Sequence, residues 1–161
     1  MNRSEITEYL QEHGIAFRQQ EHPAAQTIED IENYGLDGTE TIAKNLFLRD
    51  DKKRNYYLVT VCKDKTVNLK ELRTVLGSRP LSFASESDLQ NILCLQRGAV
   101  TPLGLLNDDL RRVSFVLDRD ITDFATVGVH PNENTATVWL APSNLLALIR
   151  EHGNEILIVQ L

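Results

Sequence analysis

The order of helix-like and strand-like segments along the chain narrows the possible folds sharply. Helical spacing of apolar residues, each time with a capping residue in front, predicts helices that begin near residues 2–4, 28, 69, 86 and 143. Apolar or alternating runs of strand length lie at residues 15–17, 46–48, 56–61, 113–117, 126–129, 135–140 and 156–159. Hairpins and helices are interspersed rather than regularly alternating, which argues against a doubly wound fold. We therefore expect an α+β fold built on a mixed, strongly curved, barrel-like β-sheet with surrounding helices.

Length and composition predict one globular domain over residues 1–161. The chain is 42% hydrophobic and 25% charged, so it can bury a core, and no repeat or linker divides it. No apolar run approaches the roughly 20 residues of a membrane helix, and the charged N-terminus lacks the apolar stretch of a signal peptide. We therefore expect a cytoplasmic protein without a membrane partner. Cys62 and Cys94 form no CxxC pair and are expected as reduced thiols in or near the core.

Positive charge is concentrated in one part of an acidic chain. The net charge is -6, yet residues 44–79 contain ten Lys and Arg against four Asp and Glu, a net +6. The overall acidity argues against non-specific coating of nucleic acid. The basic segment favours a local anion-binding face. The alternative is that these residues merely keep strand ends and a hairpin tip, such as DDKKRN, in contact with water.

The chain carries none of the common sequence signatures of catalysis. GxSxG, HExxH, the Walker loop and GxGxxG are all absent. The four histidines have no metal-binding spacing with one another or with the cysteines. His13 and His152 each precede a helix-ending glycine, where interaction with the last carbonyls explains them. The inventory disfavours a metalloenzyme or a covalent hydrolase, and we expect neither a metal nor a cofactor.

Three polar clusters occur in settings that suggest chemistry. Lys44-Asn45 stands just before the apolar run 46–48, where an ammonium must reach water or an anion. Two glycines and a proline define the backbone path of residues 98–104, and such a loop can present N–H and C=O groups to a ligand. Residues 130–135 join two strand-like runs. Each cluster also has a plain structural explanation: a lysine at a strand end, a connecting loop and a hairpin turn.

Together these clusters resemble the family of freestanding tRNA-editing domains related to YbaK and to the editing insertion of bacterial prolyl-tRNA synthetases. The resemblance extends from about His22 to Leu161, and the order and spacing of its motifs make it specific. It is carried by His22-Pro23 with Thr27, Ala43-Lys44-Asn45-Leu46-Phe47-Leu48, Leu81-Ser82-Phe83-Ala84, residues 98–108, and His130-Pro131 with Asn134-Thr135-Ala136-Thr137. The combination KNLFL, GxVTPxGLxND and HP…NxT is most similar to the branch that hydrolyses alanyl-tRNA specific for proline.

The resemblance implies an enzyme that hydrolyses the ester between an amino acid and the terminal ribose of tRNA, without a covalent intermediate. In the family, the lysine matching Lys44 engages the 3′ end of the substrate. The loop matching Gly98 to Pro102 positions the ester and the ribose through backbone groups, so Gly98, Thr101 and Pro102 join Lys44 as expected catalytic residues. A ribose hydroxyl of the substrate is expected to help activate the water. The expected substrate-binding residues are His22, Thr27, Asn45, Ala99, Val100, Gly104, His130 and Asn134.

The sequence allows more than one answer for the amino acid that the expected enzyme removes, and it suggests two partners. Alanine is smaller than proline, so a tight pocket can admit the wrong amino acid and exclude the right one. The candidate pocket wall Ala24-Ala25-Gln26-Thr27 departs from the bulkier Pro-Val-Phe-Thr-like run expected after His22-Pro23. Cysteine, serine or another small amino acid therefore remains an alternative to alanine. A non-catalytic sensor of aminoacyl-tRNA, or a regulator of proline metabolism, is the alternative of another class. The expected partners are the acceptor end of tRNA(Pro) and prolyl-tRNA synthetase, and the oligomeric state stays open.

Overall fold

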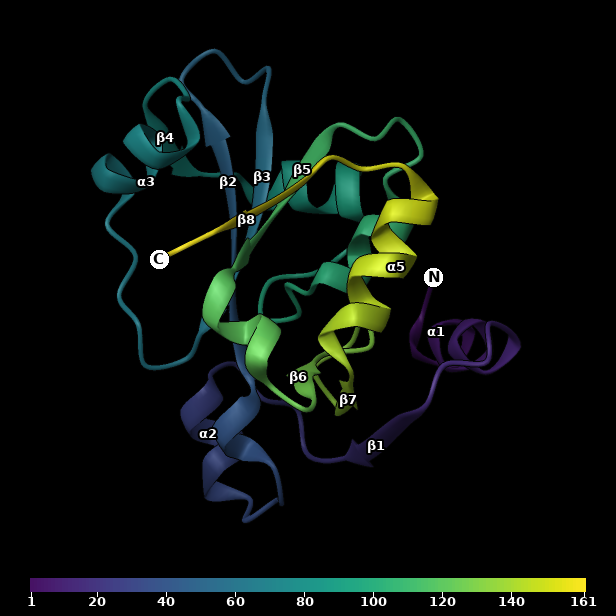
Figure 1. Cartoon of the computed structure of the whole chain (residues 1–161). Coiled ribbons are helices and arrows are strands. Elements are labelled where there is room, and N and C mark those ends of the chain that lie inside the picture. The colour runs from purple at the N-terminus through teal and green to yellow at the C-terminus, as the bar shows by residue number, and fades with distance from the viewer.

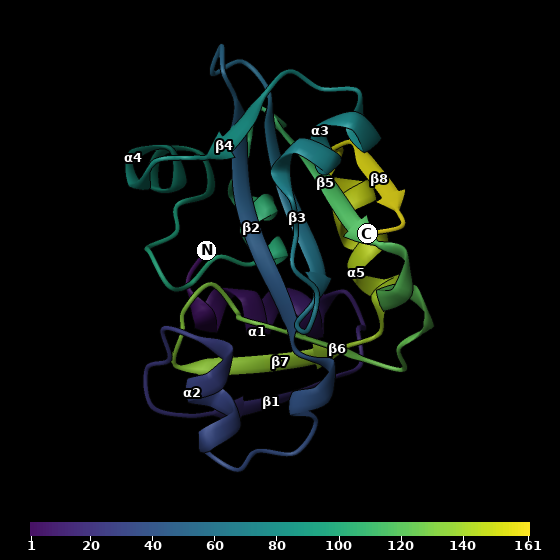
Figure 2. The same ribbon diagram turned by 90° about the vertical axis from the view of Figure 1, so that its left-hand side faces the viewer.

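The computed structural model describes all 161 residues and contains two β-sheets with helices around them (Figure 1). The larger sheet has the strand order β4-β2-β3-β5-β8, and the smaller one has the order β1-β7-β6. Figure 2 shows the smaller sheet running across the lower end of β2. The strands are β1 (Phe17–Glu21), β2 (Ala43–Asp50), β3 (Tyr56–Cys62), β4 (Leu81–Phe83), β5 (Val113–Asp118), β6 (Val127–Val129), β7 (Ala136–Leu140) and β8 (Ile156–Val159).

The helices begin close to the predicted caps. Asn2, Thr27, Asn68 and Ser85 each accept a hydrogen bond from a backbone N–H of the first turn that follows them. The α-helices are α1 (Arg3–Glu12), α2 (Ile28–Asn33), α3 (Leu69–Leu76), α4 (Glu86–Asp88) and α5 (Pro142–His152). Between them lie a π-helical turn, η2 (Leu89–Leu93), and the 3₁₀ segments η1 (Thr39–Thr41), η3 (Pro102–Asn107) and η4 (Arg119–Asp123).

The predicted mixed α+β class is confirmed, but the barrel-like sheet is wrong. Strands β2 and β3 form the predicted antiparallel hairpin, whereas β3–β5 and β5–β8 are parallel pairs. Strand β7 pairs with β1 on one side and with β6 on the other, and these three strands do not extend the larger sheet, so the strands divide into two open sheets. Neither sheet is closed or strongly curled. Strand length and alternation can be inferred from sequence, but the partner of each strand depends on long-range contacts.

The core fills the space between the two sheets and is closed by α1 and α5. Leu58 and Phe115 of the larger sheet, Val138 of the smaller one, Leu10 of α1 and Leu145 of α5 belong to one buried cluster. Helix α3 covers the opposite face of the larger sheet, where Leu72 packs against Leu48, Val59 and Val116. Figure 1 shows α3 on one side of this sheet and α5 on the other. Strand β3 is thus buried on both faces, which explains its continuous apolar run.

Several local predictions differ from the structure. Lys44-Asn45 lies inside β2 rather than before it, and the short strand β4 was not predicted. Cys94 is exposed instead of lying in or near the core. Cys62 is half-buried, and burial together with the Asp118 carboxylate raises the pKa of its thiol to about 11, so it stays protonated. None of the helices combines the length and apolar character that crossing a bilayer requires.

Candidate active site

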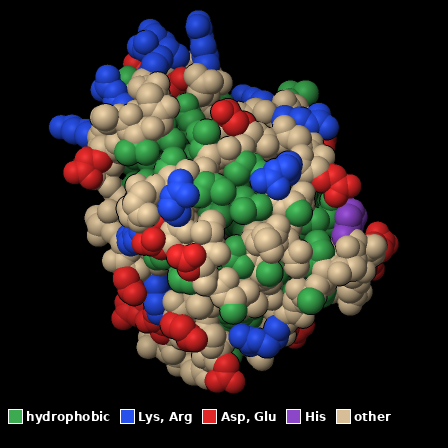
Figure 3. Space-filling model, in the orientation of Figure 1, with side chains coloured by type: hydrophobic (Ala, Val, Ile, Leu, Met, Phe, Trp, Pro, Cys, Tyr) green, Lys and Arg blue, Asp and Glu red, His purple; other side chains and the backbone are tan.

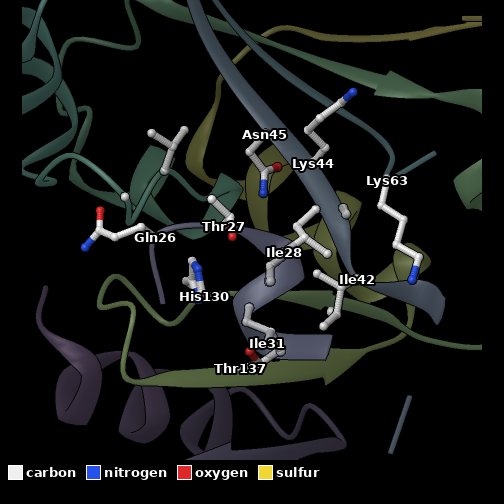
Figure 4. Close-up of a pocket in the computed structure, with 15 residues that line it drawn as sticks. Gln26, Thr27, Ile28, Ile31, Ile42, Lys44, Asn45, Lys63, His130 and Thr137 are labelled. Atoms are coloured by element: carbon white, nitrogen blue, oxygen red, sulfur yellow. The ribbon is translucent and has the colours of Figure 1, made fainter. Parts of the chain in front are cut away.

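A cavity of about 480 Å³ opens where the start of β2 meets β6, β7 and α2. Its position follows from the fold, because Ile42 bridges to Gly128 and brings the two sheets together there. Figure 4 shows side chains from α2, β2 and the segment after β6 converging on the cavity. Its walls are formed by Gln26, Thr27, Ile28, Ile31, Ile42, Ala43, Lys44, Asn45, Lys63, Gly98, Val100, Gly128, Val129, His130 and Thr137.

Asn45 presents a fixed hydrogen-bond donor to this cavity. Its neighbour across the hairpin is Thr60, and the buried Thr60 hydroxyl donates to Asn45 Oδ1 over 2.6 Å. The amide group is therefore oriented with its oxygen occupied and its Nδ2 free to donate. Figure 4 shows Nδ2 directed into the cavity. A preorganised amide donor of this kind can stabilise charge that develops on a carbonyl oxygen.

Lys44 lies on the wall, but its ammonium does not point to the centre of the cavity. Successive strand residues face opposite sides of a sheet, so Lys44 and Asn45 diverge. Lys44 Nζ donates to the backbone carbonyl of Lys65, and Figure 4 shows it directed away from His130. The Lys65 ammonium is itself held by Asp118 at 2.9 Å and Asp120 at 2.6 Å. A long flexible side chain can leave a single carbonyl for a bound anion with little loss of energy.

A second lysine stands at the rim. Lys63 follows β3 and forms an ion pair with Glu32 of α2, with Nζ 2.5 Å from Oε1. This pair connects the hairpin to α2 beside the opening, so positive charge lies close to any ligand that enters. Lys63 was not predicted as a site residue. The excess of Lys and Arg in residues 44–79 was the only indication of it, because nothing in the sequence shows that α2 lies next to the end of β3.

His130 lines the cavity and His22 lies behind its wall, and both imidazoles are hydrogen-bonded. Burial, together with the nearby His22, lowers the pKa of His130, even though the Ala136 carbonyl, 3.0 Å from Nδ1, favours the protonated ring. A carbonyl only accepts, so Nδ1 carries the proton and Nε2 remains an acceptor. His22 Nδ1 likewise donates to the Pro23 carbonyl over 2.8 Å, and Thr137 donates to His22 Nε2 over 2.9 Å.

Thr137 and His22 resemble the hydroxyl–imidazole part of a catalytic triad, but the rest of a triad is missing. The third partner, the Pro23 carbonyl, is neutral and gives an imidazolium far less stabilisation than a carboxylate does. Thr137 is also only 1% exposed. The pair therefore serves best as a hydrogen-bonded wall that fixes strand β7 behind the cavity.

The glycine-containing loop contributes backbone to the cavity and anchors its surroundings. Gly98 has a φ of 87°, a left-handed backbone conformation that favours glycine, and it lies against the Gln26 side chain. Thr101 is fully buried, and its hydroxyl donates to the His130 carbonyl over 2.6 Å. Pro102 begins the buried segment η3. Gly104 packs against Leu95, where a Cβ would come within 2.5 Å of Cδ1.

The structure brings six of the predicted site residues together and places the other six around them. Thr27, Lys44, Asn45, Gly98, Val100 and His130 line the cavity. His22, Thr101, Pro102 and Gly104 lie behind its wall. Ala99 and Asn134 line a neighbouring polar cavity, with Asn134 Nδ2 donating to the Ala25 carbonyl over 2.9 Å. The apolar walls Ile28, Ile31, Ile42 and Val129 were not predicted, since their spacing looks like ordinary core residues. The candidate wall residue Gln26 does line the cavity, whereas Ala25 packs into a small core cluster.

A preformed cavity with an amide donor, a neutral imidazole, backbone from a glycine loop and two lysines is typical of a protein that binds a polar, anionic ligand and positions it. Comparison with known proteins identifies the family to which such a binding site belongs. The model of the aminoacyl-tRNA editing domain family matches residues 22–148. The chain belongs to this family, and the resemblance seen in its motifs is confirmed.

Individual relatives cover nearly the whole chain. The prolyl-tRNA editing protein ProX of Acetoanaerobium sticklandii is 43% identical over 141 residues, which are 88% of this chain and 86% of that protein. Prolyl-tRNA synthetase associated domain-containing protein 1 of Mus musculus is 37% identical over 161 residues, 98% and 95% of the two chains. A solved structure described as a candidate trans-editing enzyme for prolyl-tRNA synthetase aligns with a TM-score of 0.73 at 22% identity, covering 99% and 96%, and shows the same fold.

Proposed function

We propose that this protein is an aminoacyl-tRNA deacylase that removes a wrongly attached amino acid, alanine in the first place, from tRNA(Pro). Membership of the editing-domain family and the ProX relative support the reaction class. The observation that carries the proposal is the Asn45 amide, which Thr60 orients so that its donor faces a cavity lined by Lys44, Gly98 and His130.

In the proposed reaction, water attacks the aminoacyl ester directly. Asn45 Nδ2 donates to the ester carbonyl oxygen and stabilises the negative charge that develops there. The backbone at Gly98 and Val100 holds the terminal ribose, so that one of its hydroxyls can help to activate the water. No protein nucleophile takes part. An aminoacyl ester is already labile, so positioning and electrostatic stabilisation supply the catalysis.

Two lysines and the imidazole hold the remaining parts of the substrate. Lys44 exchanges the Lys65 carbonyl for the phosphate of the terminal nucleotide, and Lys63 adds a second positive charge at the rim. His130 Nε2 carries no proton and accepts a hydrogen bond from the ammonium group of the amino acid. Thr101 acts through His130 as a positioning residue, because it holds the His130 carbonyl.

Selection for a small amino acid rests on the apolar walls. Ile28, Ile31 and Ile42 line the cavity and give it an apolar wall. A wall of branched side chains excludes the proline ring and admits alanine, which is the logic of a second sieve. Cysteine is only one sulfur atom larger than alanine, so Cys-tRNA(Pro) is the alternative substrate of the same reaction.

The decisive experiment is single-turnover hydrolysis of Ala-, Cys-, Ser- and Pro-tRNA(Pro) by the wild type, Lys44→Ala and Asn45→Ala. We expect rapid loss of alanine, no loss of proline and a strong decrease in both variants. Circular dichroism controls for folding, and Lys70→Ala is the matched lysine control, because Lys70 is an exposed residue of α3 that lines neither this cavity nor its neighbours. Hydrolysis of none of the four substrates would exclude the deacylase. Tight binding without turnover would favour the sensor of aminoacyl-tRNA.

A further inference from the structure

A second cavity, also of about 480 Å³, runs along the open edge of β2. Strand β4 pairs with β2 only at Leu48, Arg49 and Asp50, and the last backbone contact is Ala84 N–H donating to Phe47 O over 2.9 Å. Below that point β4 no longer covers β2. The groove therefore lies between β2, the chain that follows β4, and the loop around Gly98. We call it the edge groove.

An aromatic ring and an arginine stand in the edge groove. Phe83 is 61% exposed, although a phenylalanine on a strand normally packs into a core. Arg97 lines the same groove, and its exposed guanidinium lies 3.5 Å from the Glu86 carboxylate, which is an easily exchanged contact. An exposed aromatic ring and an arginine in one groove are the side chains that bind unpaired nucleotide bases, by stacking and by cation–π contact.

The edge groove is continuous with the candidate active site. Asn45, Gly98 and Val100 line both cavities. Phe83 stands opposite Leu48, four residues along β2 from Lys44, which is roughly 13 Å at 3.3 Å per residue. Strand β2 ends two residues beyond Leu48, at Asp50, and the exposed tip with Lys52, Lys53 and Arg54 follows. Figure 3 shows Lys and Arg side chains gathered at that end of the molecule.

We propose that the edge groove binds the unpaired nucleotides that precede the terminal adenosine of the tRNA 3′ end, with one base stacked on Phe83 and Arg97 beside it. This inference rests on the proposed function. The terminal adenosine with its amino acid occupies the candidate active site, the next nucleotides follow the open edge of β2, and the acceptor stem reaches the basic tip. The groove gives affinity for the single strand and takes no part in the chemistry.

The test compares two substrates that differ only in these nucleotides. Wild type, Phe83→Ala, Phe83→Tyr and Arg97→Gln are assayed with Ala-tRNA(Pro) and with adenosine esterified to alanine at its ribose, which lacks the preceding nucleotides. Loss of base stacking is expected to lower kcat/KM for Ala-tRNA(Pro) by roughly tenfold to a hundredfold in Phe83→Ala. The same variant should hydrolyse the alanyl adenosine at the wild-type rate, and Phe83→Tyr should retain most of the activity on tRNA.

The control is Leu110→Ala, which removes another exposed apolar side chain, 80% exposed, that lines neither cavity. Equal loss of activity on both substrates in Phe83→Ala, or no loss on either, would overturn the inference. If the wild type hydrolyses neither substrate, the proposed function fails, and binding of a CCA trinucleotide then tests the groove by itself. Unchanged binding in Phe83→Ala would overturn the inference, and at least tenfold weaker binding would support it.

Discussion

At the scale of single residues, the proposed chemistry depends on side chains that never meet the substrate. Thr60 is fully buried, and its hydroxyl donates a hydrogen bond to Asn45 Oδ1. Without that bond the Asn45 amide could rotate and present oxygen, which repels a developing oxyanion. Thr60 thus has the properties of a positioning residue.

Thr60→Val keeps the shape of the side chain and removes the hydroxyl. We expect the single-turnover rate on Ala-tRNA(Pro) to fall roughly tenfold with little change in KM, since substrate binding does not use this bond. Asn45→Ala should cost more, about 10²- to 10³-fold, as for loss of an oxyanion donor. Thr60→Ser should restore the rate. A wild-type rate in Thr60→Val would show that Asn45 needs no orientation.

His130 gives a second prediction at this scale. Burial lowers its pKa below the ordinary value of 6.5, so the folded protein binds a proton on this ring less readily than the unfolded chain. The stability contributed by the neutral ring is therefore present above that value and is lost as pH falls below it. The free energy of unfolding, measured with urea, and the rate of deacylation should both decrease as the pH falls below 6.5. His130→Gln should flatten both profiles; equally steep profiles in the variant would assign the titration to another group.

At the scale of secondary-structure elements, one ionic cluster fixes the segment after β3. Asp118, at the end of β5 and 0% exposed, accepts from the Cys62 N–H over 3.2 Å and from Lys65. Burial alone would raise the pKa of Asp118, but the hydrogen bonds from Lys65 and the backbone outweigh it and lower the pKa. Since the Lys65 carbonyl accepts a hydrogen bond from Lys44, the cluster links the stability of the sheet to a lysine that lines the candidate active site.

Asp118→Asn is expected to lower the free energy of unfolding by about 3 kcal/mol, because it leaves a partly buried lysine with one carboxylate fewer. Urea denaturation measures the change. Asp120→Asn is the control: Asp120 is half-exposed and contacts the same ammonium, so its loss should lower the free energy of unfolding much less than the loss of Asp118 does. Equal losses in the two variants would contradict the importance of burial.

At the scale of the whole molecule, charge is distributed so that an acidic protein still offers a basic end. The net charge is -6, yet Lys52, Lys53 and Arg54 are exposed at the β2–β3 tip. Figure 3 shows Lys and Arg side chains gathered at that end of the molecule. In the proposed complex this tip faces the phosphates of the acceptor stem, at the far end of β2 from the cavity. Each phosphate contact releases counterions, so the contribution of the tip must depend on salt.

Replacing Lys52, Lys53 and Arg54 by Gln should weaken binding of tRNA(Pro) and reduce the slope of log Kd against log salt by about 1 to 3, measured from roughly 50 to 200 mM salt. Hydrolysis of alanyl adenosine should be unaffected, because the tip lies away from the cavity. The matched control is Arg111→Gln with Arg112→Gln, outside both cavities. An unchanged slope of log Kd against log salt in the triple variant would show that the acceptor stem does not contact this tip.

The sequence by itself determined the local structure and the family. Interactions between near neighbours in the chain determine helix caps such as Thr27 and Asn68 and the β2–β3 hairpin, so these elements can be predicted from the sequence. The polar motifs are short stretches of sequence and are recognised in the same way. Only the tertiary structure decided the division into two sheets and the meeting of Thr60, Lys63 and the isoleucines at one cavity. These depend on contacts between distant segments, and a polar or apolar residue has the same identity whether it lines a pocket or packs in a core.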